Sequence, residues 1–296
     1  MLLKKFCYLF FLLTLMGCSS DNEPIIDPPP NFISTATLSI NGDAIPTNAF
    51  VNKTEDMFTL GVSKVIITFD KEGHLGTVNM NLDTGTPTLT SLFYSYIPFS
   101  SNYINFNLIS LDEVNKRVKG TLSGYVYHNP FDLTSESKFI NLAFDYEYID
   151  FIPVIKDLKN HAKINGNQWK RSHKYMTKGT GISSSNITQH DVSDDEYKIM
   201  VNYNLGSIAT GTYNFSANSD TNAIKLAKYD IASGNYIVYN CSGTLNITQK
   251  ENLTNINTTG AFILSGNYNF LAVNPNNSAD VIAVTEGTFK LVYTYF

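Results

Sequence analysis

The chain has 296 residues, of which 43% are hydrophobic and 16% charged, and its formal net charge is −5. An acidic chain of this kind lacks the basic face of an electrostatic nucleic-acid-binding protein, so we expect no nucleic acid among its partners. The length allows one or two domains, and the abundance of Tyr, Phe and Asn favours β structure.

The first residues have the features of an export signal. Lys4 and Lys5 precede an apolar run over residues 6–16, which is too short for a membrane-spanning helix of about 20 apolar residues. The run ends in Leu15-Met16-Gly17-Cys18, which resembles the lipobox of bacterial lipoproteins, although Met16 departs from the small or β-branched residue usual there. The resemblance implies a signal peptide over residues 1–17 and a fatty acid such as palmitate on Cys18. An ordinary secretory signal with an incidental cysteine is the alternative.

Residues 18–33 are predicted to form a lipid-anchored, proline-rich tether. Pro28-Pro29-Pro30 favours an extended chain of about 3.1 Å per residue, which holds the next domain away from the bilayer. Ser19 stands where many lipoproteins retained in the inner membrane have aspartate, and the acidic residues 21–23 resemble a surface-export tag. We therefore expect the lipid on Cys18 to attach the protein to the outer membrane, with the cell surface favoured over the periplasmic face.

Four segments alternate apolar and polar residues with a period of two, which is typical of antiparallel strands with one face in water. They are residues 103–110, 140–148, 197–203 and 289–295. Turn signals lie at residues 41–43, 71–73, 165–167 and 233–235. Residues 223–229 fit either a short helix or a strand. The pattern predicts an all-β protein.

Two halves of the chain share an order of motifs. Ile40-Asn41-Gly42 and Ile164-Asn165-Gly166 open them, and each half closes with a Ser-Gly strand, an Asn-Pro loop and a long aromatic strand. Shared order indicates a divergent duplication. We expect two tandem antiparallel β-sandwich or barrel-like domains over residues 34–152 and 161–296, joined by a linker at 153–160.

The second half also resembles an uncharacterised family of small, β-rich bacterial lipoproteins. The matching motifs begin with an Asn-Gly-x-x-Trp opening and end with a Gly-x-Phe strand, and they are met here by residues 165–169, 211–213, 243–248, 265–270 and 287–289. The first half matches faintly, because Ile45 stands where Trp169 stands in the second. These motifs are structural, so the resemblance implies a fold and a location and no activity.

Sequence motifs for chemistry are scarce. The chain has no zinc signature, phosphate loop, dinucleotide fingerprint or nucleophile elbow, and we expect no metal and no cofactor. His161, His173 and His190 have no spacing that demands a metal, and the acidic residues 191–196 lack the glycine of a known calcium loop, although calcium there stays an open alternative. Cys241 is the one cysteine left after processing, and a small buried residue is the favoured interpretation.

These observations predict a binding or adhesion module without catalysis, whose partner is a surface protein or a glycan. The candidate ligand-binding residues lie in the second half: Trp169, His173, Asp191, Asp194, Asp195 and Glu196. An indole in Trp169's position also fits a plug at the end of a β core. The alternative is a hydrolase or glycan-binding protein acting on envelope or extracellular polysaccharide. Two carboxylates, or a Ser/His/acid set, converging in one pocket would favour the hydrolase.

Overall fold

The computed structural model of the protein describes residues 32–83, 91–153, 155–178, 185–253 and 261–293. The chain divides into two compact units, Met1–Ile33 and Ser34–Phe296, and the fold below is that of the second. The predicted signal peptide and Cys18 lie outside the described residues. No helix among the described residues combines the length and apolar character that a membrane crossing requires.

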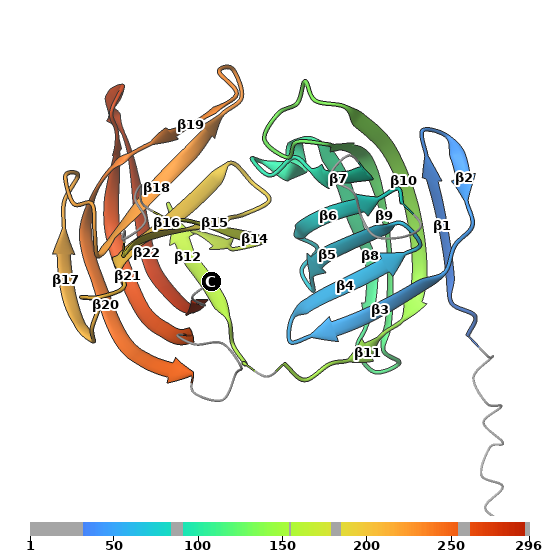
Figure 1. The fold of residues 1–296 in the computed structure, drawn as a ribbon, viewed down its shortest axis with the longest axis horizontal. Coiled ribbons are helices and arrows are strands. Elements are labelled where there is room, and N and C mark those ends of the chain that lie inside the picture. The colour runs from blue at the N-terminus through green and yellow to red at the C-terminus, as the bar shows by residue number, and fades with distance from the viewer. Residues whose placement is uncertain (1–31, 84–90, 154, 179–184, 254–260, 294–296) are drawn as a thin grey trace, which may run out of the picture. The chain divides into compact units, whose positions relative to one another are not determined.

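The first half forms one 11-stranded sheet (Figure 1). Its order is β11-β3-β4-β5-β6-β7-β9-β10-β1-β2, with β8 also pairing to β9. All pairs are antiparallel except β11 with β3. In Figure 1 the strands β3 to β6 lie in front of β8 to β10. The elements are β1 (Thr35–Ile40), β2 (Asp43–Ile45), β3 (Ala49–Thr54), β4 (Met57–Val62), β5 (Val65–Asp70), β6 (Leu75–Asn81), β7 (Leu92–Ser95), the 3-10 helix η2 (Ser100–Asn102), β8 (Ile104–Asp112), β9 (Arg117–Tyr127), β10 (Ser137–Glu147) and β11 (Ile149–Asp150).

The second half consists of two antiparallel sheets. One has the order β13-β12-β22-β21-β20-β17, and the other has the order β14-β15-β16-β18-β19. The chain passes from the first sheet to the second between β13 and β14. The strands are β12 (Lys159–Ile164), β13 (Asn167–Lys170), β14 (His173–Lys178), β15 (Asn186–Val192), β16 (Tyr197–Asn204), β17 (Gly211–Phe215), β18 (Ala223–Asp230), β19 (Asn235–Val238), β20 (Asn240–Leu253), β21 (Ala261–Asn274) and β22 (Asn277–Tyr293).

Each half has its own hydrophobic core. In the first half the core contains Phe58, Phe69 and Leu122, drawn from β4, β5 and β9. In the second half it lies between the two sheets, where residues of β16 and β18 pack with residues of β20, β21 and β22. In the longer strands, such as β10, alternate residues enter these cores, which is why the period of two was visible in the sequence. The prediction of an all-β fold is confirmed.

Most details of the strand predictions are also confirmed, with one exception. Residues 223–229 form strand β18, which settles the choice between helix and strand. The predicted apolar face of β16 lies in the core, but its other face is not exposed to water as expected. Lys198, Met200 and Asn202 on that face are at most 9% exposed. The expectation of a solvated face on β16 was therefore wrong, because other parts of the protein cover it.

The Asn-Gly turns of the two halves have the same local geometry. Asn41 and Asn165 have φ angles of 52° and 48°, and each is followed by a glycine with positive φ. Two successive left-handed residues match the right-handed twist of the hairpin strands. Each asparagine also pairs with a distant strand: its Oδ1 accepts from the backbone N–H of Phe139 or Ala283, and its own N–H donates to the carbonyl of the same residue. The sheets of the two halves are connected differently, so a duplication stays a prediction.

A cluster of tyrosines joins the two halves. The hydroxyls of Tyr96 and Tyr229 lie 2.9 Å apart in a buried contact, and Tyr103 packs edge-on against Tyr96. Next to η2, the backbone N–H of Ser101 donates to the carbonyl of Asp194 at 2.9 Å. These contacts connect β7 and η2 of the first half with β18 and the β15–β16 turn of the second.

Candidate functional site

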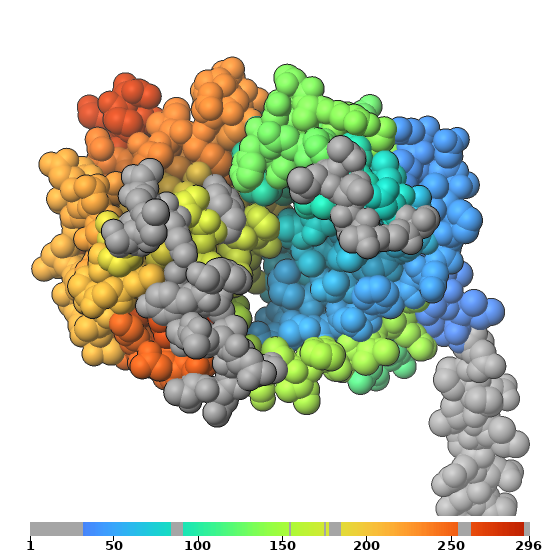
Figure 2. Space-filling view, viewed as in Figure 1, coloured from blue at the N-terminus to red at the C-terminus, as the bar shows by residue number. Residues whose placement is uncertain are grey.

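A cleft of about 720 Å³ lies where the two halves meet. Figure 2 shows the blue surface of the first half and the yellow-green segment of the second half meeting with a narrow gap between them. A volume of this size falls in the range of small-molecule sites. The cleft is lined by Glu55, Asp56, Met57, Thr68, Asp70, Glu72, Thr77, Asp157, Leu158, Lys159, Asn160, His161, Lys170, Arg171, Ser172, His173 and Lys174.

The two walls of the cleft carry opposite charge. Carboxylates dominate the wall from the first half, where Glu55, Asp56, Asp70 and Glu72 come from the turns that flank β4 and β5. Basic and imidazole side chains dominate the wall from the second half, at Lys159, His161, Lys170, Arg171, His173 and Lys174. Such a polarised cleft favours a ligand that carries both signs of charge.

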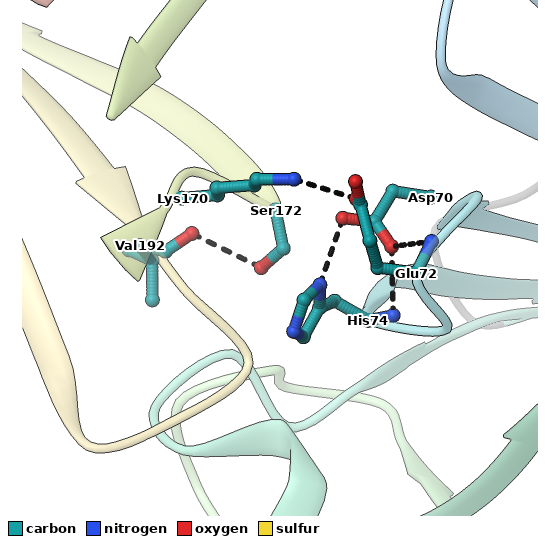
Figure 3. A network of polar contacts seen from close by, with 6 residues as sticks. All are labelled: Asp70, Glu72, His74, Lys170, Ser172 and Val192. Atoms are coloured by element: carbon teal, nitrogen blue, oxygen red, sulfur yellow. Dashed lines mark hydrogen bonds and ion pairs between the residues drawn. The ribbon is translucent and has the colours of Figure 1, made fainter. Parts of the chain in front are cut away.

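In the β5–β6 turn, the residues of the acidic wall form a network of hydrogen bonds (Figure 3). Asp70 ends β5, and its Oδ1 accepts hydrogen bonds from the backbone N–H groups of Glu72 at 3.0 Å and His74 at 2.9 Å. Gly73 has a φ of +91°, which allows the chain to turn between them. Asp70 Oδ2 lies 2.8 Å from His74 Nδ1. One carboxylate therefore organises the whole turn.

The protonation of this pair follows from the contacts. Burial acts to raise the pKa of Asp70, but the hydrogen bonds from His74 and Glu72 outweigh it and lower that pKa below its ordinary value. The hydrogen bond to Asp70 raises the pKa of His74 above its ordinary value, against the opposing effect of burial. The turn therefore favours an ionised Asp70 and a protonated His74.

Two contacts connect the β5–β6 region with the second half across the cleft. Lys170 Nζ lies 2.6 Å from Glu72 Oε2, and both side chains are about two-fifths exposed. The backbone of Gly76 on β6 also approaches the backbone of Ser172 closely: a Cβ placed on Gly76 would lie 3.1 Å from the carbonyl oxygen of Ser172. Glycine at position 76 allows that approach. The half-exposed ion pair contributes about 0–1 kcal/mol on its own, so it orients the turn more than it stabilises the protein.

Asp70, Glu72 and His74 are also the one group among the described residues whose potential metal-ligand atoms lie within 4.8 Å of one another. Their donors are already engaged: Asp70 by two N–H groups and His74, and Glu72 by Lys170. A metal would have to displace both the imidazole proton and the lysine ammonium. The arrangement therefore supports an ion network better than a metal centre.

Asp70, His74 and Ser172 supply the residue types of a hydrolytic triad. Figure 3 shows the three side chains on neighbouring segments of the two halves. The Ser172 hydroxyl, however, donates its proton to the carbonyl oxygen of Val192 at 3.1 Å. A nucleophilic serine needs its proton accepted by the base, so this geometry does not activate Ser172.

Trp169 and Asp191 are part of the interior. Trp169 is 2% exposed, and its Nε1 donates to Ser193 Oγ at 2.7 Å, so it occupies the core-plug position. Asp191 is fully buried and accepts from Asn160 Nδ2 at 2.7 Å and from Gln189 Nε2 at 2.8 Å. Arg171 Nη1 lies 3.4 Å from the same carboxylate. Trp169 and Asp191 are too buried to contact a ligand, and they are not part of the cleft site.

The other predicted residues are dispersed. His173 lines the cleft, and burial lowers its pKa below the ordinary value; its role in binding stays a prediction. Asp195 accepts from Ser193 and from the backbone N–H of Tyr197, and Glu196 pairs with Lys228 at 3.1 Å. Asp194 holds Ser101 through its carbonyl. The carboxylates of Asp191, Asp195 and Glu196 therefore bind separate protein donors, and residues 191–196 form no group of potential metal-ligand atoms in the described part of the chain.

Sequence reasoning missed the acidic wall altogether. Asp70, Glu72 and His74 occupy alternate positions around a predicted turn, so the sequence could have indicated that their side chains lie close together. Their partner Lys170 is about a hundred residues away, and no sequence signal links the two. No family model, curated protein or solved structure matches the chain.

Proposed function

We propose that the protein is a lipid-anchored, non-enzymatic binding module of the cell envelope, exposed on the outer membrane, and that its ligand occupies the cleft between the two halves. The ligand class is a small hydrophilic molecule or peptide end with both positive and negative groups. The observation that carries the proposal is the opposite charge of the two cleft walls. The lipid anchor on Cys18 and the surface location rest on the sequence alone.

The cleft has charged groups available for such a ligand. Lys159, Lys174 and Asp157 line it, are exposed, and take part in none of the ion pairs found among the described residues. The lysines would hold a carboxylate or phosphate, and Asp157 with the neighbouring acidic wall would hold an ammonium group. Charge pairs of this kind provide orientation and a fast association rate more than raw affinity.

The lining favours this class over a neutral glycan. Among the described lining residues none is Trp, Tyr or Phe, so the cleft offers no flat ring on which a sugar would stack. Only Met57 and Leu158 contribute apolar side chains, which argues against a hydrophobic ligand.

Calorimetric titration tests the proposal. Oligopeptides carrying both charges should bind, neutral oligosaccharides should not, and a Lys159→Glu/Lys174→Glu variant should lose at least about tenfold in affinity. Lys163→Glu is the matched control, because Lys163 lies on the same strand as Lys159 but outside the cleft lining. Binding of neutral sugars, or peptide binding that the double variant leaves unchanged, would contradict the cleft site.

A hydrolase acting on envelope or extracellular polysaccharide is the second candidate. Asp70, His74 and Ser172 are residues of the types it would use, although the Ser172 hydroxyl donates to Val192 and not to His74. It predicts turnover of an ester or polysaccharide substrate that Ser172→Ala and His74→Ala both abolish. Turnover of this kind would replace the non-enzymatic proposal.

The anchor has a separate test. Metabolic labelling with a fatty-acid analogue should mark the native protein and not Cys18→Ala. Protease added to intact cells should then cleave the native protein if it lies on the cell surface. Equal labelling of both proteins would exclude the anchor.

A further inference from the structure

The covered face of β16 contains a lysine that the cleft does not use. Lys198 is 7% exposed and pairs in register with Ala227 of β18. Its Nζ lies 3.8 Å from the centre of the Tyr236 ring. No carboxylate among the described residues forms an ion pair with it.

The surroundings of Lys198 disfavour its charge. Burial alone lowers the pKa of Lys198 to about 8, with no charged neighbour contributing. Burial also lowers the pKa of His190 on the adjacent strand β15 to about 4, and the charge of Lys198 adds to that shift. The two groups therefore lie near enough to interact electrostatically, with a neutral imidazole beside the amine.

A lysine in this position is not explained by stability. A ring contact compensates a buried ammonium only partly, and an apolar side chain of similar length would pack the same space without a desolvation cost. Desolvated lysines with a large neutral fraction are the ones that act as nucleophiles toward carbonyl groups.

We propose that Lys198 is a reactive amine that condenses with a small aldehyde on the covered face of β16. The lone pair of Nζ attacks the carbonyl carbon, the carbonyl π electrons move to oxygen, and a proton passes from nitrogen to that oxygen to give a carbinolamine. The carbinolamine then takes up a proton on its hydroxyl group and expels it as water while the nitrogen lone pair forms the C=N bond. The resulting iminium ion releases its N–H proton, which restores the proton taken up, and the imine remains on Lys198. His190, which stands opposite Met200 on the adjacent strand, and Tyr236, whose ring contacts the amine, are candidate groups to relay these protons. The low exposure restricts the ligand to small aldehydes. This site is independent of the cleft.

The test uses propanal with cyanoborohydride, which reduces the imine to a stable propyl-lysine that peptide mass spectrometry locates. At about pH 7 roughly a tenth of the amines with a pKa near 8 are neutral, against fewer than about one in a thousand for an ordinary lysine. We expect Lys198 in the folded protein to be alkylated at least about tenfold faster than Lys225. Lys225 is the matched comparison, because it lies on the neighbouring strand opposite Met200.

Two variants identify the site. Lys198→Arg keeps the positive charge without a nucleophilic amine, and Lys198→Met keeps the length without the charge, so both should lose the fast adduct and retain the slow ones. Alkylation of Lys198 no faster than that of Lys225, or alkylation of Lys198 only after unfolding in urea, would overturn the proposal. Either result can be read on the native protein, whatever the stability of the variants.

Discussion

Replacing Asp191 by alanine should destabilise the protein strongly. Its buried carboxylate accepts from Asn160 Nδ2 and Gln189 Nε2 and lies beside Arg171, so the substitution removes the acceptor of two buried donors and the counter-ion of the partly buried Arg171. Breaking such a buried charged network typically costs about 3–5 kcal/mol. The loss also spreads, because Asn160 Oδ1 accepts from the buried Tyr268 hydroxyl at 2.7 Å and depends on Asp191 for its orientation.

Urea unfolding followed by Trp169 fluorescence measures this cost. Trp169 is the single tryptophan and is buried, so its emission should move to longer wavelength on unfolding. Asp194→Ala is the matched control, with an expected cost below about 1 kcal/mol, because Asp194 contacts the first half through its backbone. An Asp191→Ala protein of native stability that had lost ligand binding would refute this reasoning and restore Asp191 as a site residue.

Three further predictions concern the junction between the halves. The pKa of His74 is raised in the folded protein, so its stabilising contact with Asp70 should be fully present below the unfolded pKa and lost as the pH rises through the folded pKa. His74→Ala should therefore lower the urea midpoint in mildly acidic buffer and have the midpoint of the native protein in alkaline buffer. A difference in midpoint that persists in alkaline buffer would contradict a charged His74–Asp70 contact. Gly76→Ala should cost about 1–3 kcal/mol, because its Cβ would collide with the Thr68 hydroxyl and press on the Ser172 carbonyl; an unchanged thermal midpoint would show that the halves are not so close. A double-mutant cycle of Tyr96→Phe and Tyr229→Phe should give a coupling of about 0.5–1.5 kcal/mol from their 2.9 Å hydroxyl contact, whereas additive effects would place the hydroxyls apart.

The strands were predictable because a core selects every second residue. Ile140, Leu142 and Phe144 enter the first core, while Asn141 and Ala143 between them point away. The same rule failed at Lys198 and Asn202, whose polarity indicated water although other parts of the protein cover them. Burial of that face depends on the packing of segments distant in sequence, which a local pattern does not contain.

The candidate site shows the same limit. The turn signal at residues 71–73 located the β5–β6 turn, but the charged partner of this turn on β13 depends on how the halves pack. Trp169 and Asp191 were drawn to attention by their residue types, and the structure shows that both are held inside by Ser193, Asn160 and Gln189. In both cases a polar or aromatic residue that suggested a binding site in the sequence instead forms hydrogen bonds inside the protein.

The junction has two chemically different ends, and they should respond differently to solution conditions. The tyrosine end, at Tyr96 and Tyr229, is buried and uncharged, so added salt should leave it intact. At the cleft end the Lys170–Glu72 pair is partly exposed and therefore screened by salt. Rising ionic strength should therefore weaken the Lys170–Glu72 contact at the cleft and leave the Tyr96–Tyr229 contact unchanged. If the cleft binds the proposed ligand, its affinity should therefore depend on ionic strength through this edge and not through the tyrosine cluster.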